Sequence, residues 1–189
     1  MTPYDFKNIW TVDDETLTPL TLSKLSRFNL LNTTVEFLSE AGLPNYASPH
    51  LSFACNTDNN IYGIYKLTEQ SDYLDLEYEK YIAIGYCRDG DIIAIDTNDN
   101  DQIKQLDHED LFSEKFFNSS IWTLAQFLVV YRDFEKGFKS FYFTDEQFSI
   151  LRERMFAIDS KAMSTEGFWK DELEILISLR QDAINKLLT

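Results

Sequence analysis

Hydrophobic positions recur at helical spacing early in the chain. Apolar side chains repeat three and four residues apart over residues 34–41, and Thr33 with Glu36 has the spacing of a capping box. Gly42 follows this segment directly and suits the left-handed conformation that ends many helices. The pattern therefore predicts a helix over residues 34–41, preceded by a shorter helix around residues 21–28.

The middle of the chain changes to short apolar runs separated by Asn, Asp and Gly. The Asp-Gly pair in Arg88-Asp89-Gly90 tolerates the positive φ of a tight hairpin turn, and residues 57–60 and 97–100 have the composition of two further hairpin loops. Consecutive strands joined by tight turns pair antiparallel, because parallel pairing needs a crossover connection. Residues 71–79 could form a helical insertion. The predicted strands are 51–55, 61–67, 81–87, 91–96 and a weaker fifth at 102–106.

Helical spacing returns after the strands. A wide apolar stripe over residues 120–131 follows a Ser119/Ser120 cap, and Thr144 with Gln147 has capping-box spacing before the next helix. A last helix over residues 166–188 completes a predicted helical hairpin. The order predicts an α+β fold, in which N-terminal helices precede a central antiparallel β-meander of about five strands and C-terminal helices pack on it.

Length and composition favour one folded domain. The chain has 189 residues, of which 44% are hydrophobic and 15% aromatic, and this is enough apolar surface for a core. No apolar run approaches the roughly 18 residues of a membrane span, and residues 1–10 lack the apolar segment of an export signal. We therefore expect a cytoplasmic protein without membrane contact, with Cys55 and Cys87 as reduced thiols.

The charge is strongly acidic. Against 17 Lys and Arg stand 32 Asp and Glu, giving a net charge of −15 at pH 7. Nucleic-acid binding relies on basic side chains that displace counterions, so we expect no nucleic-acid partner and favour a basic protein partner. The acidic excess peaks between residues 89 and 110, where the only basic residue is Lys104. The eight carboxylates of this segment are Asp89, Asp91, Asp96, Asp99, Asp101, Asp107, Glu109 and Asp110.

Part of this segment resembles a calcium loop. Asp96-x-Asn98-x-Asn100 reproduces the first three ligand positions of an EF-hand. The sixth position, which needs Gly for a sharp turn, is Asp101, and predicted strands flank the segment in place of helices. A hairpin loop with solvated polar residues is the competing interpretation, and we predict no metal site.

Catalytic motifs are also missing from the sequence. His50 and His108 are the only histidines, the two cysteines are 32 positions apart, and the chain has neither a G-x-S-x-G elbow nor a phosphate-binding loop. We predict no catalytic residues and no cofactor. A metal-dependent hydrolase that uses the carboxylates of residues 89–110 is the alternative from a different functional class.

Two segments resemble the SUKH superfamily, also described as Smi/Knr-like. They are the helix end Phe37-Leu38-Ser39-Glu40-Ala41-Gly42-Leu43-Pro44 and the strand-turn-strand segment Ile84-Gly85-Tyr86-Cys87-Arg88-Asp89-Gly90-Asp91-Ile92-Ile93-Ala94-Ile95-Asp96. In addition, Leu106-Asp107-His108-Glu109-Asp110 and the helix over residues 120–131 fall where that family has its last strand and its sheet-packing helix. The similarity covers roughly residues 10–135.

The resemblance implies a domain organisation and a function. It implies a SUKH domain over residues 1–137, with residues 138–189 as a C-terminal helical extension packed on the same domain. Its bacterial members are mostly non-catalytic immunity proteins that bind and neutralise toxins, often nucleases or deaminases. Fungal relatives regulate cell-wall glucan synthesis, so a regulatory scaffold is the alternative function.

Acidity and resemblance together predict a binding surface for a basic toxin domain. We expect the eight carboxylates of residues 89–110 to form it, and the competing interpretation is a solvated rim that keeps the protein soluble. Tyrosines of the meander could anchor the contact, although alternation places about half of them in the core and none is assigned. These tyrosines are Tyr62, Tyr65, Tyr73, Tyr78, Tyr81 and Tyr86.

Overall fold

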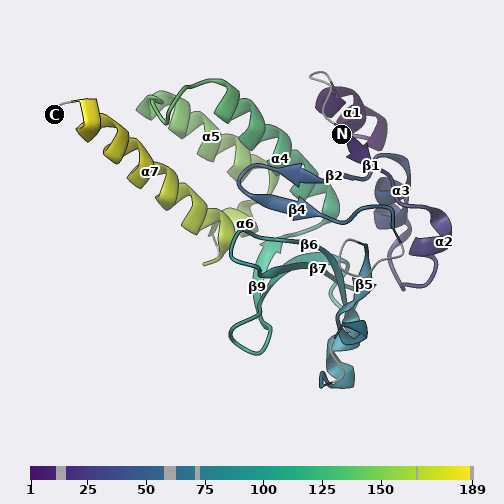
Figure 1. Cartoon of the computed structure of the whole chain (residues 1–189). Coiled ribbons are helices and arrows are strands. Elements are labelled where there is room, and N and C mark those ends of the chain that lie inside the picture. The colour runs from purple at the N-terminus through teal and green to yellow at the C-terminus, as the bar shows by residue number, and fades with distance from the viewer. Residues whose placement is uncertain (12–15, 58–62, 71–72, 165, 188–189) are drawn as a thin grey trace.

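The computed structural model describes residues 1–11, 16–57, 63–70, 73–164 and 166–187. A twisted antiparallel sheet has long helices on one face, and on its other face it carries short 3₁₀ segments and a loop (Figure 1). Helices and sheet together confirm the predicted α+β class.

The main sheet has seven strands among the described residues, against the five predicted. They are β3 (Tyr46–Ala47), β4 (Leu51–Phe53), β5 (Tyr65–Lys66), β6 (Tyr81–Tyr86), β7 (Ile92–Asp96), β8 (Gln102–Asp107) and β9 (Ser113–Asn118). Their order is β3-β4-β6-β7-β8-β9, with β5 also paired to β6. Every pair of neighbouring strands is antiparallel, as a meander requires.

The predicted hairpin between residues 51–55 and 61–67 is wrong. Within the described residues, β4 and β5 both pair with β6: Phe53 is opposite Gly85, and Tyr65 is opposite Ala83. A register shift between Ala83 and Gly85 separates these two pairings. Residues 58–60 of the predicted loop lie outside the described residues. The two strands therefore follow one another along the same edge of β6.

The β6–β7 and β7–β8 hairpins are confirmed. In the first, the Cys87 N–H donates to the Asp91 carbonyl at 2.8 Å, and Gly90 takes a φ of 91°. β9 was not predicted, because the first half of Ser113–Asn118 is exposed and carries no apolar alternation. It pairs with β8 after a loop over residues 108–112.

The N-terminal helices pack beside one edge of the sheet. They are α1 (Pro3–Trp10), α2 (Leu22–Leu25) and α3 (Asn32–Glu40), and a separate two-stranded sheet joins β1 (Leu17–Thr18) to β2 (Leu43–Pro44). The sequence analysis missed α1, although Thr2 and Asp5 form a capping box at its start. After α3, Gly42 has a φ of 71°, and a Cβ there would lie 2.1 Å from the Thr18 carbonyl oxygen. Only glycine therefore fits this turn.

The predicted capping box at Thr33 is wrong. The helix begins at Asn32, and its N-cap residue, Leu31, has no side-chain cap of its own. The Leu31 N–H instead donates to Asp101 Oδ2 at 2.7 Å, across 70 positions of sequence. A tertiary contact therefore fixes the start of α3.

The C-terminal helices cover one face of the sheet, which is called the inner face. They are α4 (Ile121–Lys136), α5 (Asp145–Ile158), α6 (Ser160–Ser164) and α7 (Phe168–Leu187). The capping boxes of Ser120 with Thr123 and of Thr144 with Gln147 are both formed. Arg180 Nη1 lies 2.6 Å from Asp145 Oδ1, so the later part of α7 meets the start of α5.

The two faces of the sheet carry cores of different size. The inner face, which packs against α4, α6 and α7, contributes Ile93, Ile95, Ile103 and Phe117 to the main core. The outer face carries a smaller cluster, which consists of Tyr65, Leu67, Tyr81, Ala83, Ile92, Ala94 and Leu106. The covering of this outer cluster includes the 3₁₀ helix η3 (Leu76–Lys80) and the loop before β9, which projects below the sheet in Figure 1. Of the predicted helical insertion at residues 71–79, residues 76–79 belong to this 3₁₀ helix, residues 73–75 are not helical, and residues 71–72 lie outside the described residues.

Both cysteines are free. Cys87 is buried, and burial raises the pKa of its thiol far above the ordinary value, which keeps the sulfur protonated and unreactive. Cys55 is half-buried. Within the described residues, no helix is both long and apolar enough to cross a bilayer.

Candidate protein-interaction site

The eight carboxylates of residues 89–110 fall at two ends of the meander. Consecutive hairpins turn at alternate ends of the strands. The β6–β7 turn and the β8–β9 loop lie together, since a Cβ on Gly90 would be 3.4 Å from His108 Cε1. One end therefore holds five carboxylates (Asp89, Asp91, Asp107, Glu109 and Asp110), and the other end holds three (Asp96, Asp99 and Asp101).

Asp91 is buried and joins the two turns at its end. Its Oδ1 accepts from His108 Nδ1 at 2.8 Å and from the His108 backbone N–H at 3.2 Å, while Oδ2 accepts from Gln105 Nε2 at 2.7 Å. Burial opposes the ionisation of Asp91, but the bonds from His108 and Gln105 outweigh it, so its pKa lies below the ordinary value. The bond to Asp91 raises the pKa of His108 in turn.

Asp96 and Asp101 are buried at the opposite end. Asp96 lies 3.1 Å from Lys80 Nζ and accepts the Asn98 N–H at 2.9 Å. Asp101 accepts the Leu31 N–H that starts α3. Asp96 is thus turned inward, as a hairpin-loop residue that holds its own turn.

The other five carboxylates reach the surface to different degrees. Asp99 pairs with Lys104 at 3.2 Å, and Asp107 pairs with Lys115 at 3.4 Å. Asp89, Glu109 and Asp110 are exposed. Asp89 Oδ1 lies 3.4 Å from Arg88 Nε, whereas the structure gives no ion pair to Glu109 or Asp110 among its described residues. Glu109 and Asp110 are therefore exposed without an ion pair among the described residues, Asp89, Asp99 and Asp107 are paired at the surface, and the other three of the eight are buried.

One cluster has donor atoms close enough for a metal ion. The ligand atoms of Asp91, Asp107 and His108 lie within 4.8 Å of one another. Both oxygens of Asp91 already accept bonds from protein donors, and Asp107 is paired with Lys115. These contacts describe a hydrogen-bonded structural cluster, and we assign no metal to it.

A groove opens on the outer face between η3 and the β8–β9 loop. Its volume is about 620 Å³, and its lining runs from Asn98 at one end of the meander to Asp110 at the other. Aromatic rings form part of it: Tyr78 lies 6.3 Å from both Tyr81 and Phe112, measured between ring centroids. The groove thus brings residues from both ends of the meander around one aromatic surface.

The loop beside this groove holds an unusual backbone. Leu111 and Phe112 take φ values of 49° and 57°, a region that bulky side chains rarely adopt. The Phe112 N–H donates to the Asp107 carbonyl at 2.8 Å, and Tyr78 Oη donates to the Leu111 carbonyl at 3.0 Å. The Leu111 side chain is 82% exposed, so its packing contributes little free energy to offset this backbone strain.

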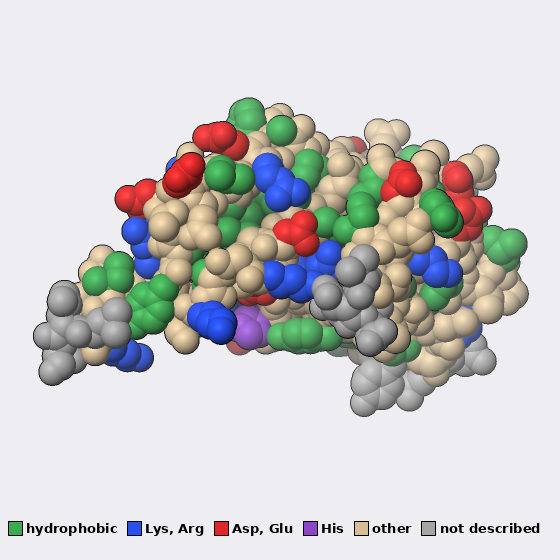
Figure 2. Space-filling view, turned by 90° about the horizontal axis from the view of Figure 1, so that it is seen from above, with side chains coloured by type: hydrophobic (Ala, Val, Ile, Leu, Met, Phe, Trp, Pro, Cys, Tyr) green, Lys and Arg blue, Asp and Glu red, His purple; other side chains and the backbone are tan. Residues whose placement is uncertain are grey.

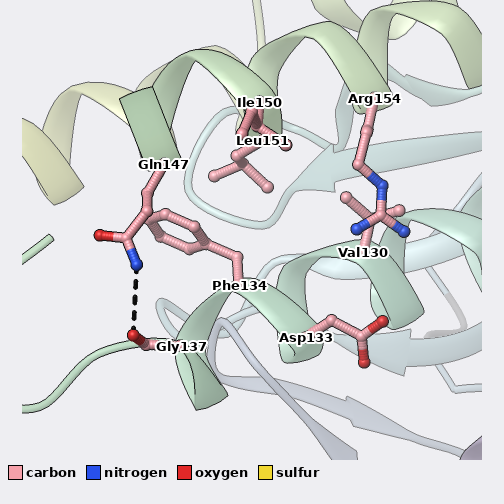
Figure 3. Close-up of a pocket in the computed structure, with 8 residues that line it drawn as sticks. All are labelled: Val130, Asp133, Phe134, Gly137, Gln147, Ile150, Leu151 and Arg154. Atoms are coloured by element: carbon pink, nitrogen blue, oxygen red, sulfur yellow. Dashed lines mark hydrogen bonds between the residues drawn. The ribbon is translucent and has the colours of Figure 1, made fainter. Parts of the chain in front are cut away.

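The helix-covered side of the molecule differs from the loop-covered side in its surface charge and in the size of its cleft. Figure 2 looks onto it and shows Lys and Arg side chains interspersed with Asp and Glu. A small cleft of about 180 Å³ lies between α4 and α5 (Figure 3). Phe134 and Leu151 line its middle, Arg154 and Asp133 lie at one end, and Gln147 donates to the Gly137 carbonyl at 3.3 Å at the other. This volume is below the 300–1,000 Å³ of typical small-molecule sites.

The groove was not predicted from the sequence. Among the tyrosines considered there, Tyr65 and Tyr81 are buried, Tyr78 and Tyr86 are half-buried, Tyr73 is 75% exposed, and Tyr62 lies outside the described residues. The sequence feature that could have indicated the groove is the apolar pair Leu111-Phe112, which directly follows four polar residues.

Comparison with protein families identifies the family to which the chain belongs. The model of the SUKH-4 immunity protein family matches residues 11–175, which extends beyond residue 137 through α5 and α6 into α7. No curated protein and no solved structure gives a significant match. The matched region contains the meander, the groove and the sheet-packing helix, and it supports a role in toxin immunity. The chain belongs to the SUKH-4 immunity protein family of the SUKH superfamily.

Proposed function

We propose that the protein is a non-catalytic cytoplasmic immunity protein that binds and neutralises a toxin domain acting on nucleic acid, a nuclease or a deaminase. The family match over residues 11–175 carries this proposal. It favours the toxin-binding branch of the superfamily over a regulator of cell-wall synthesis.

Charge supplies the mechanism of the proposed blockade. A toxin that acts on a polyanion needs a basic surface, and a protein of net charge −15 attracts that surface over long range. Such attraction raises association rates by roughly 10–10³-fold at low salt. The bound immunity protein would then occupy the position of the nucleic acid.

Among the eight carboxylates, those that are exposed to solvent contact the toxin domain in this proposal. Asp89, Glu109 and Asp110 make direct contact in this proposal, and Asp99 and Asp107 contribute from their paired positions. The buried carboxylates of Asp91 and Asp96 hold the turns that present the others, and that of Asp101 ties its turn to the start of α3.

The first test is protection. Co-expression with the toxin domain encoded by the neighbouring gene should restore growth, and the two proteins should co-purify. A toxin that stays lethal and forms no complex with this chain would refute the proposal for that pair.

The second test addresses the acidic contact. The triple variant Asp89→Asn, Glu109→Gln, Asp110→Asn should lower the association rate about tenfold at low salt and flatten its salt dependence. A control with the same net charge neutralises Glu36, Glu40 and Glu146, which are exposed on α3 and α5. Equal rate losses in both variants would show that only the total charge matters.

A further inference from the structure

One wall of the outer-face groove carries an exposed apolar side chain. Leu111, on the β8–β9 loop, lines the groove and is 82% exposed. It lies beside the aromatic rings of Tyr78 and Phe112, so the apolar surface of the groove is continuous rather than a single scattered side chain. Because the backbone strain at Leu111 and Phe112 presents this loop, the exposed apolar wall is maintained at a cost in stability.

Two exposed carboxylates accompany this apolar surface. Glu77 and Asp110 both line the groove and are exposed, and the described part of the chain offers neither of them an ion pair. Glu114, by contrast, is held within 3.7 Å of both Lys80 and Lys104. The groove therefore keeps uncompensated negative charge on both of its walls.

The aromatic surface already holds one cation of the chain itself. Lys80 Nζ lies 4.5 Å from the centroid of the Tyr81 ring and 3.1 Å from Asp96. The neighbouring rings of Tyr78 and Phe112 meet edge to face and line the rest of the groove. Faces of such rings attract cations, and a planar guanidinium can stack on them while its N–H groups reach carboxylates.

We propose that this groove binds an arginine side chain from a basic segment of the partner protein, with the guanidinium between the aromatic floor and the carboxylates of Glu77 and Asp110. Apolar atoms beside that arginine pack on Leu111. Charge complementarity and the size of the groove select this occupant, since about 620 Å³ accommodates a long side chain with part of its backbone. The inference rests on the proposed function in one respect, namely that the partner is the toxin domain.

A peptide experiment tests the groove without the toxin. The probe is an acetylated hexapeptide, Gly-Leu-Arg-Leu-Arg-Gly, and its control replaces both arginines by citrulline, which has a similar shape and no charge. NMR titration should shift the amides of residues 77–81 and 110–113 with the arginine peptide and leave them nearly unchanged with the citrulline peptide.

Variants then separate the groove from the general acidity. Glu77→Gln with Asp110→Asn should weaken peptide binding roughly fivefold to tenfold, whereas Glu36→Gln with Glu40→Gln, which changes the net charge equally, should leave it within about twofold. All four side chains are exposed, so thermal unfolding should confirm an intact fold in both variants. Equal weakening in the two variants, or equal binding of the citrulline peptide, would overturn the inference.

The toxin domain separates this inference from the proposed function. If the toxin binds and its affinity is unchanged by Glu77→Gln with Asp110→Asn and by Leu111→Asn, the groove proposal fails while the immunity function stands. If the arginine peptide binds in the groove but the toxin does not bind at all, the proposed function fails for that toxin and the groove remains a site for basic segments.

Discussion

The two faces of the sheet use their aromatic and acidic residues differently. On the inner face, Trp169 is buried, stacks edge-on against Phe117 and Phe127, and donates its indole N–H to Asn118 Oδ1 at 3.0 Å. On the outer face, the Tyr78 and Phe112 rings line an open groove beside the exposed carboxylates of Glu77 and Asp110. The comparison teaches that the helix-covered face is organised for stability, whereas the loop-covered face gives up stability to remain accessible.

The largest expected effect comes from comparing two substitutions by alanine, one on each face. Trp169→Ala should cost about 3–5 kcal/mol of unfolding free energy, because it leaves a cavity among aromatic rings that cannot collapse. Phe112→Ala should cost only about 1–2 kcal/mol, because Phe112 is half-buried. Urea denaturation of both variants measures the difference, and equal costs would contradict the assigned roles of the two faces.

The next largest effect concerns the junction of the two turns. Asp91→Asn removes the charge that pairs with His108 and should cost about 1–2 kcal/mol near pH 5.5. The pKa of Asp91 is lowered by folding, so its contribution is present above the ordinary carboxyl pKa and is lost as pH falls through the folded value. The pKa of His108 is raised, so its contribution is present below the ordinary histidine pKa and is lost as pH rises through the folded value.

The cost of Asp91→Asn should therefore be largest between about pH 4 and pH 6.5 and should decrease as pH rises through the raised pKa of His108. NMR titration of the His108 ring protons provides the direct readout, since the pKa of His108 should return to its ordinary range in the variant. An unchanged histidine pKa would mean that Asp91 does not act on His108 as assigned.

A smaller effect of opposite sign is expected at the strained loop. Leu111→Asn should raise the unfolding free energy by about 0.5–1 kcal/mol, because Asn tolerates positive φ and Leu111 loses little packing. Thermal unfolding measures the gain, and Leu111→Ala is the control that removes the side chain without relieving the backbone. A loss of stability in the Asn variant would show that Leu111 packs against the protein after all.

The smallest effect concerns a contact between α4 and α7 on the helix-covered side. Glu172 is buried and accepts from Tyr131 Oη at 3.1 Å, and burial raises the pKa of its carboxyl. A raised carboxyl pKa means that stability falls as pH rises from the ordinary value through the folded one. Glu172→Gln should therefore raise the melting temperature slightly at pH 8 and lose this advantage near pH 4.5. A gain at pH 4.5 as large as at pH 8 would contradict this assignment.

Local signals predicted the parts of the fold that depend on neighbouring residues. The cap predicted at Ser119/Ser120, the capping box at Thr144 and the turn at Gly90 each need only a few adjacent side chains, and all three are present, the first with Ser120 as the capping residue. The start of α3 was wrong because its partner, Asp101, lies 70 positions away. The pairing of β4 and β5 with the same edge of β6 depends on chain packing that no turn motif records.

The candidate site was predictable only as a segment. The sequence located eight carboxylates, but their burial depends on distant partners, such as Lys80 for Asp96 and Leu31 for Asp101. The groove was not predictable, because it joins η3 to a loop 30 positions later and depends on the φ angles of Leu111 and Phe112. Composition indicated an acidic binding protein, and tertiary structure selects the residues that are free to bind.

The most direct test of the account is hydrogen–deuterium exchange on the protein alone and in complex with the toxin domain. We predict that binding slows exchange over residues 76–81 and 107–113 and leaves the cleft between α4 and α5 unchanged. Protection confined to α5 and α7, with none in the β8–β9 loop, would contradict the assignment of the outer face as the binding surface.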